Sequence, residues 1–376
     1  MCTVTSFSKT RAGYLKSFMK LLLISQVLDS EDDVLGFFHG WAREFARQTK
    51  QLIVLVLRKG SYTMPENTTV YSLGKERGVS RLSYVLNFFR IIIRERKKYD
   101  AVFVHMNQEY VVLGGWLWRL LGKKVSLWYA HGHTPFSLRV AEKFVHIVFT
   151  STKSGCRLRS GKIRVIGQGI DVEQFKIKNP PVPVRTGEKL KIEDGVLRIV
   201  SVGRISPVKR YETLLDAVAT LRERGISLRA DIFGKAGTPE QADYEKTLHE
   251  LTKQKGLCDI VRWRGSVPNR EIAEHLAESD IFVNTSITGS LDKAGLEAMA
   301  MGIPVLTSNE AYAEVLGELS GQLMYAHDDA TSLAEKVIEL NALGEAGRHA
   351  FGEKLQGIVV RDHNLTNFVG KIVGEL

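Results

Sequence analysis

Short apolar segments of strand length alternate with amphipathic segments of helical length along most of this chain. Residues 20–25 are a mainly apolar run, and the segment 37–49, after a polar loop, has apolar residues at helical spacing. Strand, loop and helix in repetition predict an α/β fold with doubly wound, Rossmann-like parallel sheets. Further strands are predicted at 52–57, 70–72, 101–105, 125–129, 145–151, 162–166, 197–202, 228–233, 260–264, 280–284, 303–306 and 320–325. Further helices are predicted at 81–98, 111–121, 211–224, 243–255, 269–279, 330–343, 348–355 and 366–376, with one more that starts near Ser290.

The alternation is interrupted at residues 176–189, which contain Pro180, Pro181 and Pro183 and show no periodic pattern. Such a segment is typical of a linker. The length of 376 residues also favours two domains over one. We therefore predict an N-terminal extension at 1–18, a first Rossmann-like domain at 19–178, a linker at 179–194, a second domain at 195–355 and a C-terminal helix at 356–376.

The composition argues against a membrane-spanning or a secreted, disulfide-bonded protein. No apolar run approaches the roughly 20 residues of a membrane-spanning helix, and the short run at 21–28 is not followed by a signal-peptide cleavage pattern. The three cysteines, Cys2, Cys156 and Cys258, are scattered, odd in number and without metal-ligand spacing. This pattern fits a reducing compartment, so we expect a cytoplasmic protein.

The positive charge is concentrated in one half of the chain. Residues 1–190 hold 31 Lys and Arg against 14 Asp and Glu, a balance of +17, while the rest holds 21 against 28, a balance of −7. A basic half can bind an anionic membrane surface, an anionic lipid-linked substrate or nucleic acid, or it can simply be a solvated face. The predicted helix 81–98 is also open to two interpretations. Its aromatic and basic residues suit either a membrane interface or packing against the sheet with the charges in water.

The first domain offers two candidate ligand-binding positions at the carboxyl ends of predicted strands, where doubly wound folds bind ligands. Gly36 lies in the loop after the first strand, but the dinucleotide fingerprint G-x-G-x-x-G is absent. His131 begins a His-Gly-His sequence directly after the strand 125–129. A histidine there can donate a hydrogen bond to an oxyanion. Together with His133 it could bind a metal ion, but no third ligand stands at a diagnostic spacing, so we expect no metal site.

The loop 203–210 of the second domain combines a glycine with fixed positive charge, between a predicted buried strand and the start of a predicted helix. Gly203 allows a ligand to approach the backbone closely. Arg204 suits a bidentate phosphate contact, and Lys209 acts as a point charge. We therefore favour a phosphate-binding loop over a basic loop in water.

The segment 288–305 is a second candidate anion site. Thr288, Gly289 and Ser290 are small residues before a predicted helix, where backbone N–H groups and the helix dipole favour negative charge. Within the helix, Glu297 has apolar neighbours, so its carboxylate needs a partner. Ribose hydroxyls would provide one, as would backbone groups or a basic residue.

These features fit one ligand class. The cations of the 203–210 loop and the helix start at Ser290 can hold two phosphates, and Glu297 can hold a ribose. Two α/β units joined by a proline-containing linker imply a cleft between them. The pattern therefore indicates a nucleoside diphosphate bound between two domains.

The second half resembles the retaining GT-B glycosyltransferases of family four, a group that includes bacterial α-mannosyltransferases and glycogen and sucrose synthases. The matching stretches are VGRISPVK at 202–209, WRGSV at 263–267, AESDIFV at 277–283 and LEAMAMGIPV at 296–305. In the first half, Gly36, His131 and 169–171 stand where the family has its glycine loop, its active-site histidine and its N-G-I-D turn. The resemblance covers about residues 19–376 and is most specific in the second half.

The resemblance implies metal-independent transfer of a sugar with retention of anomeric configuration. Arg204 and Lys209 would bind the donor diphosphate and stabilise the leaving nucleotide, and Glu297 would hold the ribose. The backbone at 265–268 would contact the base, and the last helix would cross back to the first domain. The catalytic residues implied are His131, which would contact the transferred sugar or the phosphate, Arg204 and Lys209. The donor-binding residues implied are Gly36, Gly203, Arg204, Lys209, Gly265, Val267, Gly289, Ser290, Asp292, Lys293, Leu296 and Glu297.

The chain departs from the pattern of this family at two positions. The family has two glutamates eight positions apart, and the first of them falls at Gly289, which has no side chain. Asp292 and Lys293 lie nearby and are candidates to replace it. Gln168 stands where the family usually has asparagine.

We therefore expect a hexosyltransferase in cell-surface polysaccharide or glycolipid biosynthesis, cytoplasmic and peripheral at the inner membrane face. The expected partners are a UDP- or GDP-linked sugar, a glycan or lipid-linked acceptor and an anionic membrane surface, with no nucleic acid and no cofactor. Two alternatives stay open. A GT-B nucleotide-sugar epimerase would use acidic side chains in the cleft, such as Glu31, Asp32 and Asp33. A non-catalytic nucleotide-sugar-binding protein would be consistent with Gly289.

Overall fold

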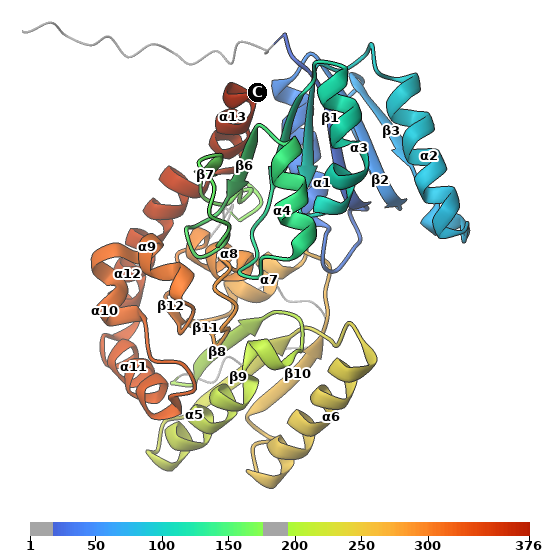
Figure 1. Cartoon of the computed structure of the whole chain (residues 1–376). Coiled ribbons are helices and arrows are strands. Elements are labelled where there is room, and N and C mark those ends of the chain that lie inside the picture. Colours follow the sequence, from blue (N-terminus) through green and yellow to red (C-terminus); the bar gives the residue numbers. More distant parts are fainter. Residues whose placement is uncertain (1–17, 176–194) are drawn as a thin grey trace, which may run out of the picture.

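The computed structural model describes residues 18–175 and 195–376. Figure 1 shows two α/β domains, with the C-terminal end of the chain returning to the domain formed by the first half. The predicted linker at 179–194 lies outside the described residues, and so does the predicted extension at 1–18 apart from Phe18. In the described part of the chain, no helix is long and apolar enough to cross a membrane.

The first domain contains a seven-stranded sheet in which all neighbouring strands are parallel. In sheet order, its strands are β3 (Thr68–Ser72), β2 (Gln51–Lys59), β1 (Lys20–Leu28), β4 (Ala101–His105), β5 (Lys124–Trp128), β6 (Ile147–Thr150) and β7 (Ile163–Val165). The continuous apolar runs of the central strands reflect burial of both faces of this sheet. The strand order reverses between β1 and β4, and such a switch point opens a crevice at the carboxyl ends of the strands.

Helices cover both faces of this sheet. One face carries α2 (Arg81–Arg94), α3 (Gln108–Leu120) and α4 (Phe136–Phe144), and the other carries α1 (Phe37–Gln48). Phe88 of α2 and Trp118 of α3 belong to the core on the first face, while Trp41 of α1 belongs to the core on the second face. The predicted helix 81–98 therefore packs on the sheet, and it ends at Arg94.

The second domain contains a five-stranded sheet, again with all neighbouring strands parallel. In sheet order, its strands are β10 (Val261–Gly265), β9 (Leu228–Phe233), β8 (Leu197–Val202), β11 (Ile281–Asn284) and β12 (Val305–Thr307). Its helices are α5 (Tyr211–Glu223), α6 (Pro239–Gln254), α7 (Ile272–Ala277), α8 (Lys293–Ala300), α9 (Ala313–Leu316), α10 (Ser320–Leu323), α11 (Ala330–Ala342) and α12 (Gly344–Ile358). The two sheets confirm the predicted doubly wound α/β fold.

The last helix, α13 (Leu365–Glu375), packs on the first domain (Figure 1). The ring of Phe368 lies 4.4 Å from that of Trp41 and 5.0 Å from that of Trp128, centre to centre. Asn364 caps the helix, because its side-chain oxygen accepts hydrogen bonds from the backbone N–H groups of Thr366 and Asn367. The final segment of the chain is thus part of the first domain's core.

The predicted strand at 320–325 is wrong. This segment forms α10, and only Met324 pairs with a strand, through one isolated bridge to Thr307. The hydroxyl of Ser320 donates hydrogen bonds to the carbonyl oxygens of Ala313 and Gly317, which keeps the chain in helical turns while Leu323 is buried. Helix α4 was not predicted. Three strands, β4, β8 and β9, have the predicted bounds.

The carboxyl ends of the two sheets face each other across a cleft. The loop after β1 reaches the loops after β9 and β10 in the second domain. Asp33 Oδ2 lies 2.6 Å from Lys235 Nζ and accepts a hydrogen bond from Ser266 Oγ (2.6 Å). Glu31 forms an ion pair with Arg270. These contacts close one rim of the cleft.

Candidate active site

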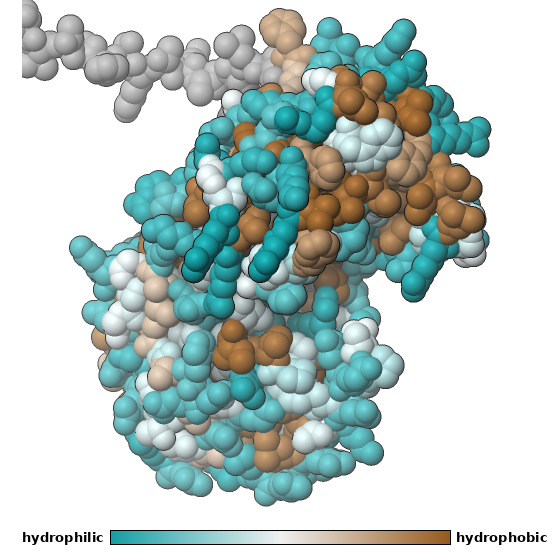
Figure 2. Space-filling view, viewed as in Figure 1, coloured by the Kyte–Doolittle hydropathy of each residue, from teal (hydrophilic) through white to brown (hydrophobic). Residues whose placement is uncertain are grey.

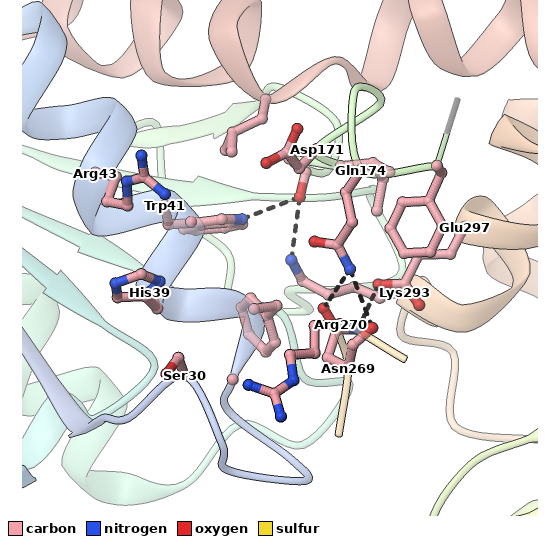
Figure 3. Close-up of a pocket in the computed structure, with 17 residues that line it drawn as sticks. Ser30, His39, Trp41, Arg43, Asp171, Gln174, Asn269, Arg270, Lys293 and Glu297 are labelled. Carbon is pink, nitrogen blue, oxygen red and sulfur yellow. Dashed lines mark hydrogen bonds between the residues drawn. The ribbon is translucent and has the colours of Figure 1, made fainter. Parts of the chain in front are cut away.

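A pocket of about 230 Å³ lies between the two domains (Figure 3). The first domain contributes helix α1 and the segment 169–175, and the second domain contributes Asn269, Arg270 and helix α8. Gly36, Lys293, Glu297 and the turn 169–171, which the sequence singled out, line this pocket together.

Lys293 reaches from the start of α8 into the first domain. Its Nζ donates a hydrogen bond to the carbonyl oxygen of Gly169 (3.1 Å), and Trp41 Nε1 donates to the same oxygen (3.0 Å). The ammonium group lies 3.6 Å from the centre of the Phe37 ring and 4.4 Å from that of the Trp41 ring. Aromatic faces and a carbonyl oxygen both attract a cation. Lys293 therefore links the second domain to an aromatic site on the first.

Glu297 lies one helical turn after Lys293 and faces the same pocket (Figure 3). The residue is 5% exposed, and its Oε1 accepts a hydrogen bond from Asn269 Nδ2 (3.2 Å). In the described part of the chain this is the only hydrogen bond to the carboxylate. Gln174 of the first domain donates to the Asn269 carbonyl oxygen (3.0 Å) and so holds Asn269 in place. The carboxylate retains acceptor capacity for the hydroxyl groups of a ligand.

Burial shifts the ionisation of Lys293 and Glu297 in opposite senses. It lowers the pKa of Lys293, and the charge of Glu297 partly opposes this shift. It raises the pKa of Glu297, and the charge of Lys293 and the hydrogen bond from Asn269 partly oppose that shift. Both groups have lost water that would stabilise their charged forms. Polar groups of a ligand in the pocket would replace part of that lost solvation.

Lys209 is paired with Asp292, the residue that precedes α8. Lys209 Nζ lies 2.7 Å from Asp292 Oδ1, and Asn284 and Asn309 donate hydrogen bonds to Oδ2 (3.0 and 3.3 Å). Burial raises the pKa of Asp292, but Lys209 and the hydrogen bonds outweigh it, and the pKa is lowered overall. The ionised Asp292 therefore holds the ammonium group of Lys209 in one position.

Gly203 and Arg204 lie beside this ion pair. The Gly203 carbonyl oxygen accepts a hydrogen bond from the Tyr211 hydroxyl (3.0 Å), and a Cβ atom on Gly203 would lie 3.3 Å from Lys209 Cε. The Arg204 side chain is exposed, and within the described residues it forms no hydrogen bond or ion pair. Of the three cations of the loop 203–210, Lys209 and Arg210 are already paired, the latter with Asp328 (3.3 Å), and Arg204 is free to bind an anion.

The remaining predicted donor-binding residues of the second domain occupy different environments. Gly265 ends β10 in a left-handed conformation (φ +69°), where nothing lies within 4 Å of an added Cβ. Val267 packs against the core of the domain, and Leu296 is fully buried in it. Leu296 as a whole residue, backbone included, is therefore not open to a ligand in this structure.

The loop at 288–290 differs from its prediction in one respect. Helix α8 begins at Lys293 and not at Ser290, because the N–H groups of the loop are bound by side chains. The Ser290 N–H donates to Thr288 Oγ1 (3.3 Å), and the Thr288 N–H donates to Ser286 Oγ (3.4 Å). An anion would have to displace these hydroxyl groups. Among the described residues, the buried hydroxyl of Ser290 itself has no hydrogen-bond partner.

Gly289 lies beside an ion pair that joins the two domains. Arg157 Nη2 of the first domain lies 2.6 Å from Glu310 Oε1 of the second. Gly289 has a left-handed backbone (φ +66°), and an added Cβ would lie 2.7 Å from Glu310 Oε1. The carboxylate of Glu310 therefore occupies the space that a side chain at position 289 would need.

His131 lies exposed at the carboxyl end of β5, outside the pocket lining. Its Nδ1 accepts a hydrogen bond from the N–H of His133 (3.1 Å), so in the neutral ring Nε2 carries the proton that a ligand could receive. A Cβ on Gly132 would lie 3.1 Å from the Thr288 carbonyl oxygen, which places the histidine loop against the 288–290 loop. No cluster of three metal-ligating side chains occurs within residues 18–175 and 195–376.

The sequence singled out Gly36 and the turn 169–171 of the first domain, but not the aromatic and basic side chains that this domain contributes to the site. Phe37 and Trp41 are four residues apart, which is also the spacing of core-facing residues on a helix. Arg43 lines the pocket, and Arg157 pairs across the cleft, but each stands in the sequence as one basic residue among many.

Residues 186–356 match the family Glycosyl transferases group 1. The matched region covers slightly less than half of the chain. It contains Gly203, Arg204, Lys209, Lys293 and Glu297, so the charged groups described above belong to the part of the chain that matches this family.

Several curated relatives share this region with the chain. A protein named as a colanic acid biosynthesis glycosyltransferase, WcaL from Escherichia coli (strain K12), is 28% identical over 51% of this chain and 44% of its own length. The amylovoran biosynthesis glycosyltransferase AmsK from Erwinia amylovora is 31% identical over 49% of this chain and 43% of its own length. The D-inositol 3-phosphate glycosyltransferase from Streptomyces avermitilis is 28% identical over 45% of this chain and 37% of its own length. The matches thus span less than half of these relatives.

Solved structures match over nearly the whole chain. The Anabaena protein Alr3699/HepE in complex with UDP-glucose superimposes with a TM-score of 0.74 at 17% identity, covering 95% of this chain and 100% of that one. The sucrose-phosphate synthase from Thermosynechococcus elongatus superimposes with a TM-score of 0.72 at 15% identity, covering 95% and 98%. At these identities the similarity concerns the fold, which is the GT-B arrangement of two parallel-sheet α/β domains.

Proposed function

We propose that this protein is a glycosyltransferase that moves a sugar from a nucleoside diphosphate sugar to a hydroxyl group of a glycan or lipid-linked acceptor. The observation that carries the proposal is the position of the charged groups in the region that matches glycosyl transferases group 1. Arg204, the Lys209–Asp292 pair and Glu297 all lie at the cleft-facing edge of the second sheet. Such edges are where ligands of doubly wound domains bind.

The reaction breaks the bond between the anomeric carbon and the diphosphate oxygen and forms a bond from that carbon to the acceptor oxygen. The acceptor loses its hydroxyl proton, and the nucleoside diphosphate leaves with the bonding electron pair. Arg204 and Lys209 would stabilise the charge that develops on the diphosphate. Asp292 would act as a positioning residue, because it holds Lys209 through a 2.7 Å ion pair and is itself fixed by two asparagines.

Glu297 would hold the ribose hydroxyls, and Lys293 would keep the aromatic site of the first domain beside it. Uridine diphosphate is the donor nucleotide that we favour, since Alr3699/HepE, which has the same fold, was solved with UDP and UDP-glucose. We also propose retention of anomeric configuration without a metal ion, and a role in polysaccharide or glycolipid synthesis. WcaL and AmsK, whose names refer to polysaccharide biosynthesis, support that role.

The epimerase alternative has less support. Its candidate acids in the loop after β1 already have partners, since Asp33 pairs with Lys235, Glu31 with Arg270 and Asp32 with Arg58.

The first test is thermal denaturation of the purified chain with UDP, GDP, and NAD as a control. A ligand that binds only the folded state stabilises it, by about 2.7 kcal/mol at a hundredfold excess over its dissociation constant. We expect UDP to raise the melting temperature and NAD to leave it unchanged. Glu297→Gln should remove most of the UDP effect, whereas Glu353→Gln, an exposed glutamate on α12, should not.

The second test is release of UDP from UDP-sugars in the presence of glycan or lipid-linked acceptors. Stabilisation by UDP without transfer to any acceptor would favour the non-catalytic binding protein. A folded sample that no nucleotide stabilises would contradict the proposed donor site.

A further inference from the structure

Large apolar side chains that remain exposed gather on three helices of the first domain. They are Leu82 (68% exposed), Leu86 (62%) and Ile93 on α2, Trp116 and Leu120 (77%) on α3, and Phe136 (80%) at the start of α4. Within α2 and α3 their spacing places them on one side of each helix. Figure 2 shows apolar side chains gathered over the region where Figure 1 places these helices. Other exposed apolar residues lie on different elements of both halves, such as Val34, Val165, Leu343 and Val360, although Val208 and Ile287 are neighbours joined by a backbone hydrogen bond.

These three helices form one continuous layer. The Phe88 ring of α2 packs edge-on against the Trp118 ring of α3, with ring centres 5.8 Å apart. Gly115 of α3 lies so close to α4 that an added Cβ would be 2.6 Å from the Phe144 Cβ. The inward sides of the helices fill the core on this face of the sheet. We call their opposite, solvent-facing sides together the outer helical face.

The outer helical face is also basic. Its exposed basic residues include Arg81 and Arg90 on α2, Arg119 on α3, and Arg139 and Lys143 on α4. Glu109 is the only exposed acidic residue on these three helices. The side chains of Arg81, Arg90, Arg139 and Lys143 form no hydrogen bond or ion pair within the described residues. Four positive charges, unpaired in the described part of the chain, therefore lie on the same three helices as the exposed apolar side chains.

We propose that the outer helical face binds the surface of an anionic lipid bilayer, with its apolar side chains in the headgroup region and its basic side chains on lipid phosphates. Leucine, tryptophan and phenylalanine beside arginine and lysine are the residues that hold helices at a membrane surface. Each basic residue near such a surface adds electrostatic attraction. A second copy of this chain is a less suitable occupant, because it would bring the same positive charge to the contact.

The face begins next to the candidate active site. Phe136 stands five residues after His131, and the histidine loop lies against the 288–290 loop of the second domain. Resting on the proposed function, this placement would let a lipid-linked acceptor reach the cleft while its lipid remains in the bilayer. Binding to lipid can be measured without any transfer reaction, so the two proposals can fail separately.

The test is flotation of the full chain with vesicles of phosphatidylcholine alone or mixed with phosphatidylglycerol, at low and high salt. We expect the chain to float with the anionic vesicles, less so at high salt because counterions screen the attraction. Leu82→Ser combined with Leu86→Ser should lower the partition coefficient at least tenfold. Arg81→Glu combined with Arg90→Glu should lower it at least as much, chiefly for anionic vesicles.

Two matched variants serve as controls. Leu343→Ser and Lys246→Glu alter exposed residues of the second domain and should leave flotation unchanged. Melting temperatures identify any variant that fails to fold, and the charge variants then carry the test without the leucine substitutions. Absence of flotation with anionic vesicles at low salt would overturn the proposal, as would flotation of both double variants like the wild type. A dimer in sedimentation that the leucine variants dissociate, without lipid binding, would assign the face to a second copy.

Discussion

The two sides of the interdomain cleft are built from different kinds of residue. The second domain contributes charged and small residues on turns that follow strands, such as Arg204, Lys209 and Gly289. The first domain contributes aromatic rings and a backbone carbonyl group, since Phe37, Trp41 and the Gly169 oxygen hold Lys293. The charged side of the second domain stands out in the sequence because its residues fall on turns between a predicted strand and a predicted helix, where doubly wound folds bind ligands. The aromatic side does not, because the same residues also form cores.

The largest expected effect concerns the charged side. Lys209→Ala removes the cation that Asp292 holds beside the proposed diphosphate site, and we expect the rate of transfer to fall about 10²- to 10³-fold. The measurement is UDP release at saturating donor. Lys246→Ala, on the exposed side of α6, is the matched control and should keep full activity. A Lys209→Ala protein with wild-type turnover would remove Lys209 from the mechanism.

The next effect concerns the aromatic side. Phe368→Ala leaves a cavity against Trp41 and Trp128, and we expect the free energy of unfolding to fall by about 3 to 4 kcal/mol. Urea unfolding followed by tryptophan fluorescence suits this test, because Trp263 is the only one of the 5 tryptophans outside the first domain. Phe351→Ala in α12, where the ring is only partly buried, should cost less. Equal losses in the two variants would contradict the assignment of α13 to the first domain's core.

The next prediction concerns how the free energy of unfolding depends on pH, because the fold buries two histidines. Burial lowers the pKa of His105, next to Phe38 and Trp41, to about 3, and it lowers the pKa of His363 to about 4. Unfolded histidine titrates near pH 6.5, so below that pH the unfolded chain binds more protons than the folded one, and stability falls with acidification. For His105 alone, we expect a loss of about 2 kcal/mol between pH 6.5 and pH 5.

The measurement is urea unfolding at a series of pH values. His105→Gln should reduce the slope of stability against pH, whereas His133→Gln, at an exposed position, should not. A slope that is the same in the wild type and in His105→Gln would show that another group causes the acid sensitivity.

The smallest expected effect concerns the ion pair between Arg157 and Glu310, which joins the two sides of the cleft beside Gly289. Gly289→Ala and Gly225→Ala both place a side chain on left-handed backbone, but only position 289 has a neighbour within 3 Å of the new Cβ. Both should lose about 1 kcal/mol from the backbone conformation. Gly289→Ala should lose about 1 kcal/mol more, because the Arg157–Glu310 pair must move. Adding Glu310→Ala should abolish this extra loss in a double-mutant cycle, and an unchanged difference would contradict the crowding by Glu310.

Most helices and strands could be predicted, since apolar periodicity and turn residues are local properties. The strand predicted at 320–325 was wrong because the segment SGQLMY has only three apolar residues, at its end, and so short a pattern does not distinguish a strand from a turn of helix. Glu297 was correctly expected to need a partner, but Asn269 as that partner could not be predicted, because the two residues meet only in the folded domain.

By itself, the sequence determined the alternation of strands and helices, the division into two α/β units and the turns that carry the charged groups of the second domain. Those features follow from hydrophobic spacing and turn chemistry within short segments. Only the tertiary structure decided that Lys293 enters the aromatic site of the first domain, and that Glu310 fills the space beside Gly289. It also decided that one side of α2 stays uncovered. These contacts depend on how the layers and domains pack, and no local pattern records residues that are distant in the chain and adjacent in space.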